Sequence, residues 1–145
     1  MRDLPRQLSA EELAELFEGR TRLVERLAEI EDPLSRADEV IASLGEEEKV
    51  EALDAHPAIG ARKLSSRSAT EQGADADPAV LAELSYLNQV YQEKFGFRFV
   101  VFVDRRPKRE ILEVLRDRIG RTRAEELDAG CRELVAIARD RWIRT

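Results

Sequence analysis

The chain has 145 residues, of which 43% are apolar and 37% charged, and its formal net charge is −6. This length suits one domain with a single hydrophobic core, and the apolar fraction is too high for a disordered chain. The negative net charge argues against a nucleic-acid-binding protein. We therefore expect a single domain that spans residues 1–145.

Cysteine content and hydropathy bear on the compartment. Cys131 is the only cysteine, so the chain can form no internal disulfide, which fits a reducing environment. No apolar run approaches the length of a membrane span, and the N-terminus lacks the apolar core of a secretion signal. We expect a cytoplasmic protein that binds neither nucleic acid nor membrane.

The first 55 residues predict a series of amphipathic helices. Ser9 and Glu12 have the spacing of a capping box, and Gly19 is expected to end the helix that they start. Asp32 followed by Pro33 is typical of a cap with proline at the first helical position. Three glutamates at 46–48 favour a further helix start. The apolar stripes are, in chain order, Leu13, Leu16 and Phe17; Leu23, Leu27 and Ile30; Leu34, Ala37, Ile41 and Leu44; Val50, Leu53 and Ala55.

The second half repeats this pattern around one extended piece. Asp77 and Pro78 predict a helix start, Gly96 its end, and residues 122–125 form another capping box before the last helix. Residues 97–103 are β-like, but no second strand is evident, and a lone strand cannot form a sheet. We predict an all-α, single-domain helical bundle with one short, buried extended segment near residues 98–103.

The only histidine opens an irregular stretch at 56–72. Pro57 pushes His56 out of helical geometry, and imidazole is the side chain best suited to proton transfer near neutral pH. A solitary histidine is more often a surface or capping residue, so that reading stays open beside the catalytic one. With one histidine and one cysteine, a zinc site of nitrogen and sulfur ligands is not expected.

Two further features have a structural and a functional reading. Ser68 and Glu71 have capping-box spacing, but a helix start also attracts anions, and Glu71 could tune a nearby histidine. Arg141 continues the apolar stripe of the last helix, where an inward guanidinium needs an anion or a route to water. Arginine can also grip a carboxylate through two parallel hydrogen bonds. Arg139 is offset on that helix and is expected to be solvated.

Four motifs in this order resemble the 2-oxo-4-hydroxy-4-carboxy-5-ureidoimidazoline (OHCU) decarboxylase family. They are His-Pro-x-Ile-Gly at 56–60, Ser-x-x-Glu-Gln-Gly at 68–73, Leu-Asn-x-x-Tyr-x-x-Lys-Phe-Gly-Phe-x-Phe at 87–99, and Ile-Ala-x-x-Arg at 137–141. Each motif alone is unspecific, but four with matching spacing cover nearly the whole chain. The resemblance implies an all-α fold and decarboxylation of OHCU to S-allantoin, in urate breakdown, without metal or organic cofactor.

The resemblance also implies roles for individual residues. The family's catalytic positions fall on His56, Glu71 and Arg141. Its substrate-binding positions fall on Pro57, Ser68 and Gln72, and on the extended segment Phe99, Val100, Val101, Phe102 and Val103, which would offer backbone contacts. The implied partner is the small molecule OHCU, and family members are often homodimers.

Two departures from the family pattern leave alternatives open. The stretch 120–122 lacks the Asn-Asp that family members often carry, and the loop 104–107 differs from the expected small-residue turn. The chain could therefore act on a different ureido or carboxy-imidazole compound. A non-catalytic helical interaction module is the other alternative, and it predicts an exposed apolar patch instead of a polar site.

Overall fold

The structure, a computed structural model, describes residues 3–58 and 77–144, and these residues are all-α. Within those ranges the backbone forms no β-strand, as the sequence predicts. No described helix is both long and apolar enough to cross a lipid bilayer. The helices are α1 (Ala10–Phe17), α2 (Arg22–Leu27), α3 (Ala37–Ser43), α4 (Glu46–Ala55), α6 (Pro78–Phe95), α7 (Lys108–Ile119) and α8 (Arg123–Arg144).

Most helices begin where the sequence predicts a cap. Ser9 Oγ accepts from the Glu12 N–H at 3.1 Å, and Glu12 Oε1 accepts from the Ser9 N–H at 3.0 Å, which completes the predicted capping box of α1. Asp77 caps α6 by accepting from the Ala79 N–H at 2.9 Å. A second capping box, formed by Thr122 and Glu125, starts α8. These side chains satisfy N–H groups that have no partner inside the helix.

The predicted start at Asp32 and Pro33 is wrong. Asp32 has a φ of 53°, in the left-handed region, whereas a capping residue needs extended backbone. Helix α3 begins five residues later, at Ala37, after a turn in which the Arg36 N–H bonds to the Asp32 carbonyl. Helix α2 also ends at Leu27, before Ile30. Tertiary contacts decide here, because the Asp32 N–H bonds to the Arg6 carbonyl at 2.7 Å.

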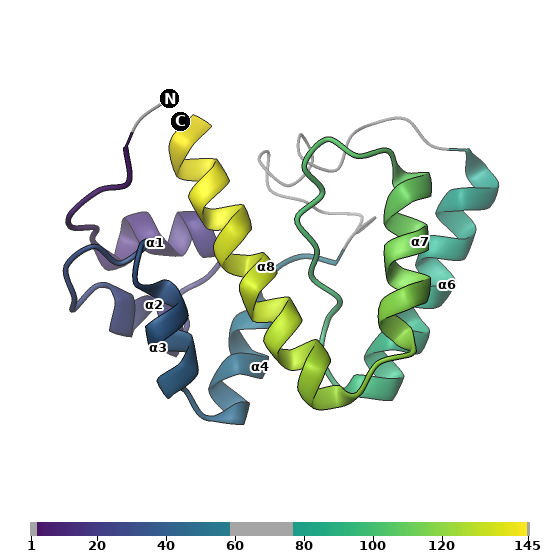
Figure 1. Cartoon of the computed structure of the whole chain (residues 1–145), viewed down its shortest axis with the longest axis horizontal. Coiled ribbons are helices and arrows are strands. Elements are labelled where there is room, and N and C mark those ends of the chain that lie inside the picture. The colour runs from purple at the N-terminus through teal and green to yellow at the C-terminus, as the bar shows by residue number, and fades with distance from the viewer. Residues whose placement is uncertain (1–2, 59–76, 145) are drawn as a thin grey trace.

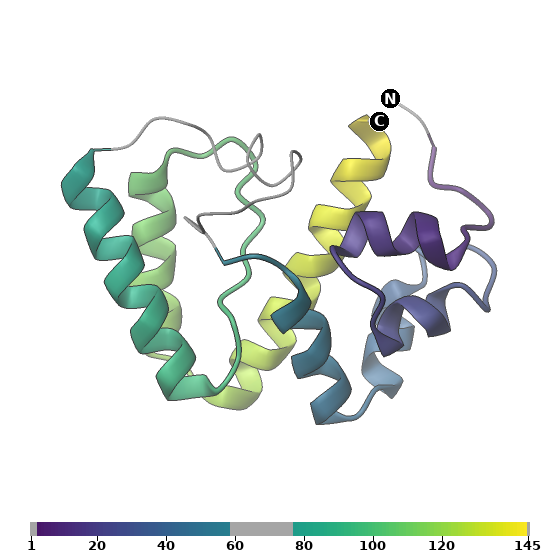
Figure 2. The ribbon, with the colours of Figure 1, turned by 180° about the vertical axis from the view of Figure 1, so that it is seen from behind.

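Helix α8 lies at the centre of the arrangement (Figure 1), with α1, α3 and α4 packed against it. Helices α6 and α7 pack on each other at the opposite side, and the extended segment 97–103 runs between this pair and α8 in both views (Figure 2). Gly130 allows the close approach of α8 to α4, because a Cβ there would lie 2.9 Å from Leu53 Cδ2. The end of α4 is therefore held tightly against the last helix.

The extended segment is buried, as the sequence predicts. Phe97, Phe99, Val100, Val101 and Val103 all belong to the core, and Phe102 is half-buried. The aromatic rings form one cluster around Tyr91 of α6, whose ring centroid lies 4.6 Å from that of Phe95 and 5.2 Å from that of Phe99. These rings are therefore core, and their packing fixes the segment beside α6.

Candidate active site

His56 lies at the C-terminal end of α4, where the following proline stops the helix. Its backbone is extended, with φ −80° and ψ 136°, and its N–H bonds to the Leu53 carbonyl at 3.2 Å. The side chain is only 7% exposed, and Nδ1 makes no hydrogen bond within the part of the chain that the structure describes. Pro57 follows it and is half-buried. His56 is therefore the C-terminal cap residue of α4, as one of the two interpretations allowed, but its imidazole faces inward and is not a surface group.

Arg141 of α8 is turned into the protein and held at the end of α1. Its Nη1 donates to the Leu16 carbonyl at 2.9 Å, and its Nη2 lies 3.2 Å from Glu18 Oε1. The arginine side chain is 1% exposed and the glutamate side chain 15%. The last carbonyls of a helix lack helical partners and carry partial negative charge, so this position suits a cation. The predicted inward arginine is therefore present, with the anion that it needs.

Arg139 takes a different position on the same helix. Its Nε donates to the Leu34 carbonyl at 2.8 Å, and its Nη2 lies 3.8 Å from Asp38 Oδ2, on the side of α8 that faces α3. Arg139 is more exposed than Arg141. Of the two arginines, Arg141 is the one beside Glu18 and the end of α1.

The electrostatics of His56 link these elements. The pKa of His56 is lowered from its ordinary 6.5 to about 4 by burial together with the positive charges of Arg141 and Arg98, while the negative charge of Glu18 opposes this shift. Burial is the largest of these causes. At neutral pH the imidazole is therefore uncharged, and it can accept a proton or a hydrogen bond. Two arginines, a glutamate and the histidine share one electrostatic neighbourhood.

Arg98 ties the extended segment to the end of α4. Its Nη1 donates to the His56 carbonyl at 2.8 Å, and its backbone N–H donates to Asp54 Oδ1 at 3.0 Å. One bond reaches His56 itself and the other reaches Asp54, two residues before it. The start of the extended segment is therefore fixed to the end of α4 that carries the imidazole.

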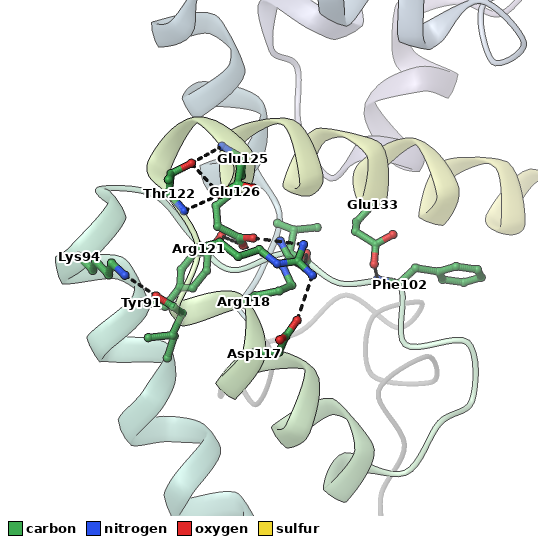
Figure 3. A network of polar contacts seen from close by, with 12 residues as sticks. Tyr91, Lys94, Phe102, Asp117, Arg118, Arg121, Thr122, Glu125, Glu126 and Glu133 are labelled. Carbon is green, nitrogen blue, oxygen red and sulfur yellow. Dashed lines mark hydrogen bonds and ion pairs between the residues drawn. The ribbon is translucent and has the colours of Figure 1, made fainter.

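Side chains also anchor the rest of the segment, in place of a neighbouring strand. Arg118 Nη1 donates to the Val100 carbonyl at 2.8 Å. Glu133 Oε1 accepts from the Phe102 N–H at 3.3 Å (Figure 3), and Arg106 Nη2 donates to the Phe102 carbonyl at 2.6 Å. These contacts come from α7, from α8 and from the loop directly after the segment, which contains Arg106. The segment is therefore fixed along its length, although it belongs to no sheet in the described residues.

A buried ion pair supports the Val100 anchor. Arg118 Nε donates to Glu126 Oε1 at 2.8 Å, and the same oxygen accepts from the Tyr91 hydroxyl at 2.6 Å. The Arg118 guanidinium also lies 4.6 Å from the centroid of the Phe99 ring. Burial and the hydrogen bond to Glu126 raise the pKa of Tyr91, so its hydroxyl stays protonated. In Figure 3 this network joins α6, α7 and α8.

The predicted site residues fall into two groups. His56, Pro57, Arg141 and the segment 99–103 lie in the described part, where His56 and Arg141 share one neighbourhood. Ser68, Glu71 and Gln72 lie outside the described residues. No group of three or more His, Cys, Asp or Glu side chains in the described ranges is arranged to hold a metal.

Sequence reasoning missed Glu18 and Arg98. Glu18 reads in the sequence as one more acid at the end of a helix, and only its left-handed backbone, with φ 65°, marks it as unusual. Arg98 alternates with the buried Phe97 and Phe99, which predicts an outward side chain. In the structure it instead turns to the His56 carbonyl. No local pattern predicts either contact, because each joins residues distant in the chain.

The sequence matches one known protein family and several of its members. The model of the OHCU decarboxylase family matches residues 2–142. A 2-oxo-4-hydroxy-4-carboxy-5-ureidoimidazoline decarboxylase of Halalkalicoccus jeotgali is 29% identical over 103 residues, 68% of this chain and 58% of that protein. The uric acid degradation bifunctional protein PucL of Bacillus subtilis is 25% identical over 146 residues, 93% of this chain and 30% of that protein. The chain thus spans less than two thirds of the length of these relatives.

Solved structures confirm the fold. A crystal structure of OHCU decarboxylase in the presence of (S)-allantoin superposes with a TM-score of 0.75 and 24% identity, covering 90% of this chain and 94% of that one. A crystal structure of (S)-allantoin synthase gives a TM-score of 0.71 and 21% identity, covering 93% of this chain and 48% of that one. The four motifs, the all-α fold and a family match over nearly the whole sequence lead to one conclusion: the chain belongs to the OHCU decarboxylase family.

Proposed function

We propose that this chain decarboxylates OHCU to S-allantoin. The observation that carries the proposal is the buried neighbourhood of His56, Arg141 and Glu18 within a chain whose family match runs from residue 2 to residue 142. By the resemblance of the motifs, His56 and Arg141 fall on the family's catalytic positions. An interaction module gives no reason to bury an uncharged imidazole among two arginines and a glutamate.

The reaction needs a place for the electrons of the breaking bond. When the bond between the ring carbon and the carboxylate breaks, CO₂ leaves and the electron pair enters the adjacent ring C=N, whose nitrogen takes a proton. The resulting enol then loses its hydroxyl proton and gains a proton on the carbon that bears the ureido group. One proton is consumed overall, and no electrons are gained or lost. Since the ring itself accepts the electron pair, the reaction requires orientation and proton transfer.

The residues of the site suit these tasks. His56 is uncharged at neutral pH and would take the hydroxyl proton and return a proton to one face of the ring. Arg141 and Arg98 make the neighbourhood attractive to an anionic substrate. General acid–base assistance of this kind contributes roughly a hundred- to ten-thousand-fold in rate. Orientation and electrostatic stabilisation would supply the rest.

The remaining roles in the proposal rest on the resemblance. Glu71 would hold a ureido or ring N–H, with Ser68, Gln72 and Pro57 beside it. The anchored segment 99–103 would offer main-chain groups to the ring, and the side-chain anchors at Val100 and Phe102 support this role because they hold that backbone in place.

Chirality provides the test. OHCU decays unaided to racemic allantoin, so freshly prepared OHCU is mixed with the protein and the product is followed by circular dichroism. Wild type should give one hand of allantoin. His56→Ala and Arg141→Lys should lose most of that signal while keeping their helix content. Arg139→Lys is the matched control, because it makes the same change on the same helix outside the site.

Two results would count against the proposal. A racemic product from the wild-type protein would refute OHCU decarboxylation, and a panel of other ureido and carboxy-imidazole compounds would then be tried. A stereoselective His56→Ala variant with near wild-type rate would remove His56 from the mechanism. The expected homodimer and cytoplasmic location are part of the same proposal, and sedimentation and cell fractionation test them.

A further inference from the structure

The backbone of Glu18 is unusual for a residue with a side chain. It stands directly after α1 with φ 65° and ψ 27°, a left-handed conformation that glycine adopts more readily. Gly19 follows it, and its N–H bonds to the Ala14 carbonyl at 2.9 Å. Glycine at position 18 would relieve the backbone, so the glutamate side chain is kept where the main chain does not favour it.

The Glu18 carboxylate meets Arg141 inside the protein. Oε1 lies 3.2 Å from Nη2, and only 15% of the glutamate side chain and 1% of the arginine side chain are exposed. On the same guanidinium, Nη1 donates to the Leu16 carbonyl at 2.9 Å. Leu16 and Glu18 are two residues apart, so one short stretch at the end of α1 holds both terminal nitrogens of Arg141. A guanidinium held at two nitrogens has a defined plane.

The charges of Glu18 and Arg141 also balance each other beside His56. Arg141 and Arg98 both act on His56, and Glu18 is the acidic group that opposes them there among the described residues. A buried guanidinium without an anion nearby would be costly, so Glu18 offsets the charge of Arg141 when no anionic substrate is bound.

We propose that Glu18 is a positioning residue of the site: it fixes the plane of the Arg141 guanidinium and offsets its charge, so that Arg141 meets the substrate in one orientation. This inference rests on the proposed function. Glu18 acts through Arg141 and needs no contact with the substrate. Its loss should therefore lower kcat and leave KM unchanged or lower, since the variant site has one negative charge fewer near an anionic substrate.

The kinetic test uses two variants of Glu18 and a matched control. Glu18→Ala removes both charge and contact and should lower kcat by about 10- to 100-fold, the range that a misplaced catalytic group produces. Glu18→Gln keeps an acceptor for Nη2 and should lose less. Glu15→Ala changes the same charge one turn earlier on α1, where the side chain is exposed, and should leave both constants unchanged.

A double variant separates positioning from general damage. In an Arg141→Ala background, which removes both the guanidinium that Glu18 orients and the charge that it offsets, Glu18→Ala should add no further loss in kcat. Losses that multiply would show that Glu18 does not act through Arg141 and would overturn the proposal. A wild-type kcat in Glu18→Ala would overturn it as well. If Glu18→Ala does not fold, Glu18→Gln carries the same comparison.

A measurement without substrate distinguishes this inference from the proposed function. His56 is the only histidine, so its ring protons give one unambiguous titration by NMR. Glu18→Gln should lower the pKa of His56 below the wild-type value, because Glu18 raises it, whereas Glu15→Gln should not change it. An unchanged pKa in Glu18→Gln would overturn the proposal. An inactive wild type with the expected titration would instead refute the proposed reaction and retain the Glu18–Arg141–His56 arrangement.

Discussion

The buried imidazole of His56 should make stability depend on pH in a defined window. In the unfolded chain His56 takes up a proton near its ordinary pKa of 6.5, but in the folded protein it does so only near 4. Between these values the unfolded state binds more protons than the folded state, so acid favours unfolding. The stability due to neutral His56 is complete above pH 6.5 and is lost as the pH falls toward 4.

The magnitude follows from these two pKa values. Each tenfold difference in proton affinity is worth about 1.4 kcal/mol, so the full lowering of the pKa from 6.5 to about 4 corresponds to roughly 3 kcal/mol. Between about pH 7.5 and 5.5, a window that stays above the sequence pI of about 5.0, the loss should be about 1.3 kcal/mol. Carboxylates also titrate in acid, so the histidine must be isolated by a variant.

Urea unfolding at several pH values provides the assay. Wild type and His56→Asn are unfolded across this window, and the change in unfolding free energy with pH is compared between them. The variant can be more or less stable overall, because only the difference in slope reports on His56. A wild-type slope equal to that of the variant would refute the reasoning. It would mean that the folded protein binds a proton at His56 near the ordinary pKa. His56 would then be charged at acidic pH and could not act there as a neutral base.

Two further predictions concern the frame around the site. Glu126→Ala should destabilise the protein by roughly 3–5 kcal/mol in urea unfolding, because it leaves Arg118 buried without its anion; Glu113→Ala, which breaks an exposed ion pair, should do far less. Ser9→Ala should cost about 1 kcal/mol by removing the α1 cap, whereas Ser9→Asp should keep most of the stability. Equal effects of the two glutamate variants, or of the two Ser9 variants, would contradict these assignments.

The elements that sequence predicts well are those whose signals are local. Ser9, Asp77 and Thr122 act within three residues of their own positions, so side-chain chemistry alone locates the helix starts. The same rule fails at Asp32, because a bond to Arg6 and a left-handed backbone override the local preference for a cap. A dipeptide pattern contains no information about a contact made 26 positions earlier in the chain.

The residues of the candidate site also divide into those that a local pattern predicts and those that only the packing of the helices reveals. Arg141 could be predicted because a charged residue interrupts a run of buried positions on α8, and a buried charge demands a partner. Its partner could not, since Glu18 resembles many other surface acids until α1 and α8 pack together. Periodicity shows which side chains face inward. The identity of the groups that they meet depends on how helices cross, which sequence periodicity does not specify.

The bond from the Trp142 indole N–H to the Asp3 carbonyl, at 2.7 Å, joins the beginning of the described chain to the last turn of α8. Terminal turns of helices fray, and Arg141 lies in the last turn of α8, next to Trp142. The hydrogen bond to the Asp3 backbone therefore stabilises that turn. Removing Asp3, or attaching a tag that displaces it, would break this hydrogen bond and make the Arg141 guanidinium, 138 positions away in the sequence, less well fixed.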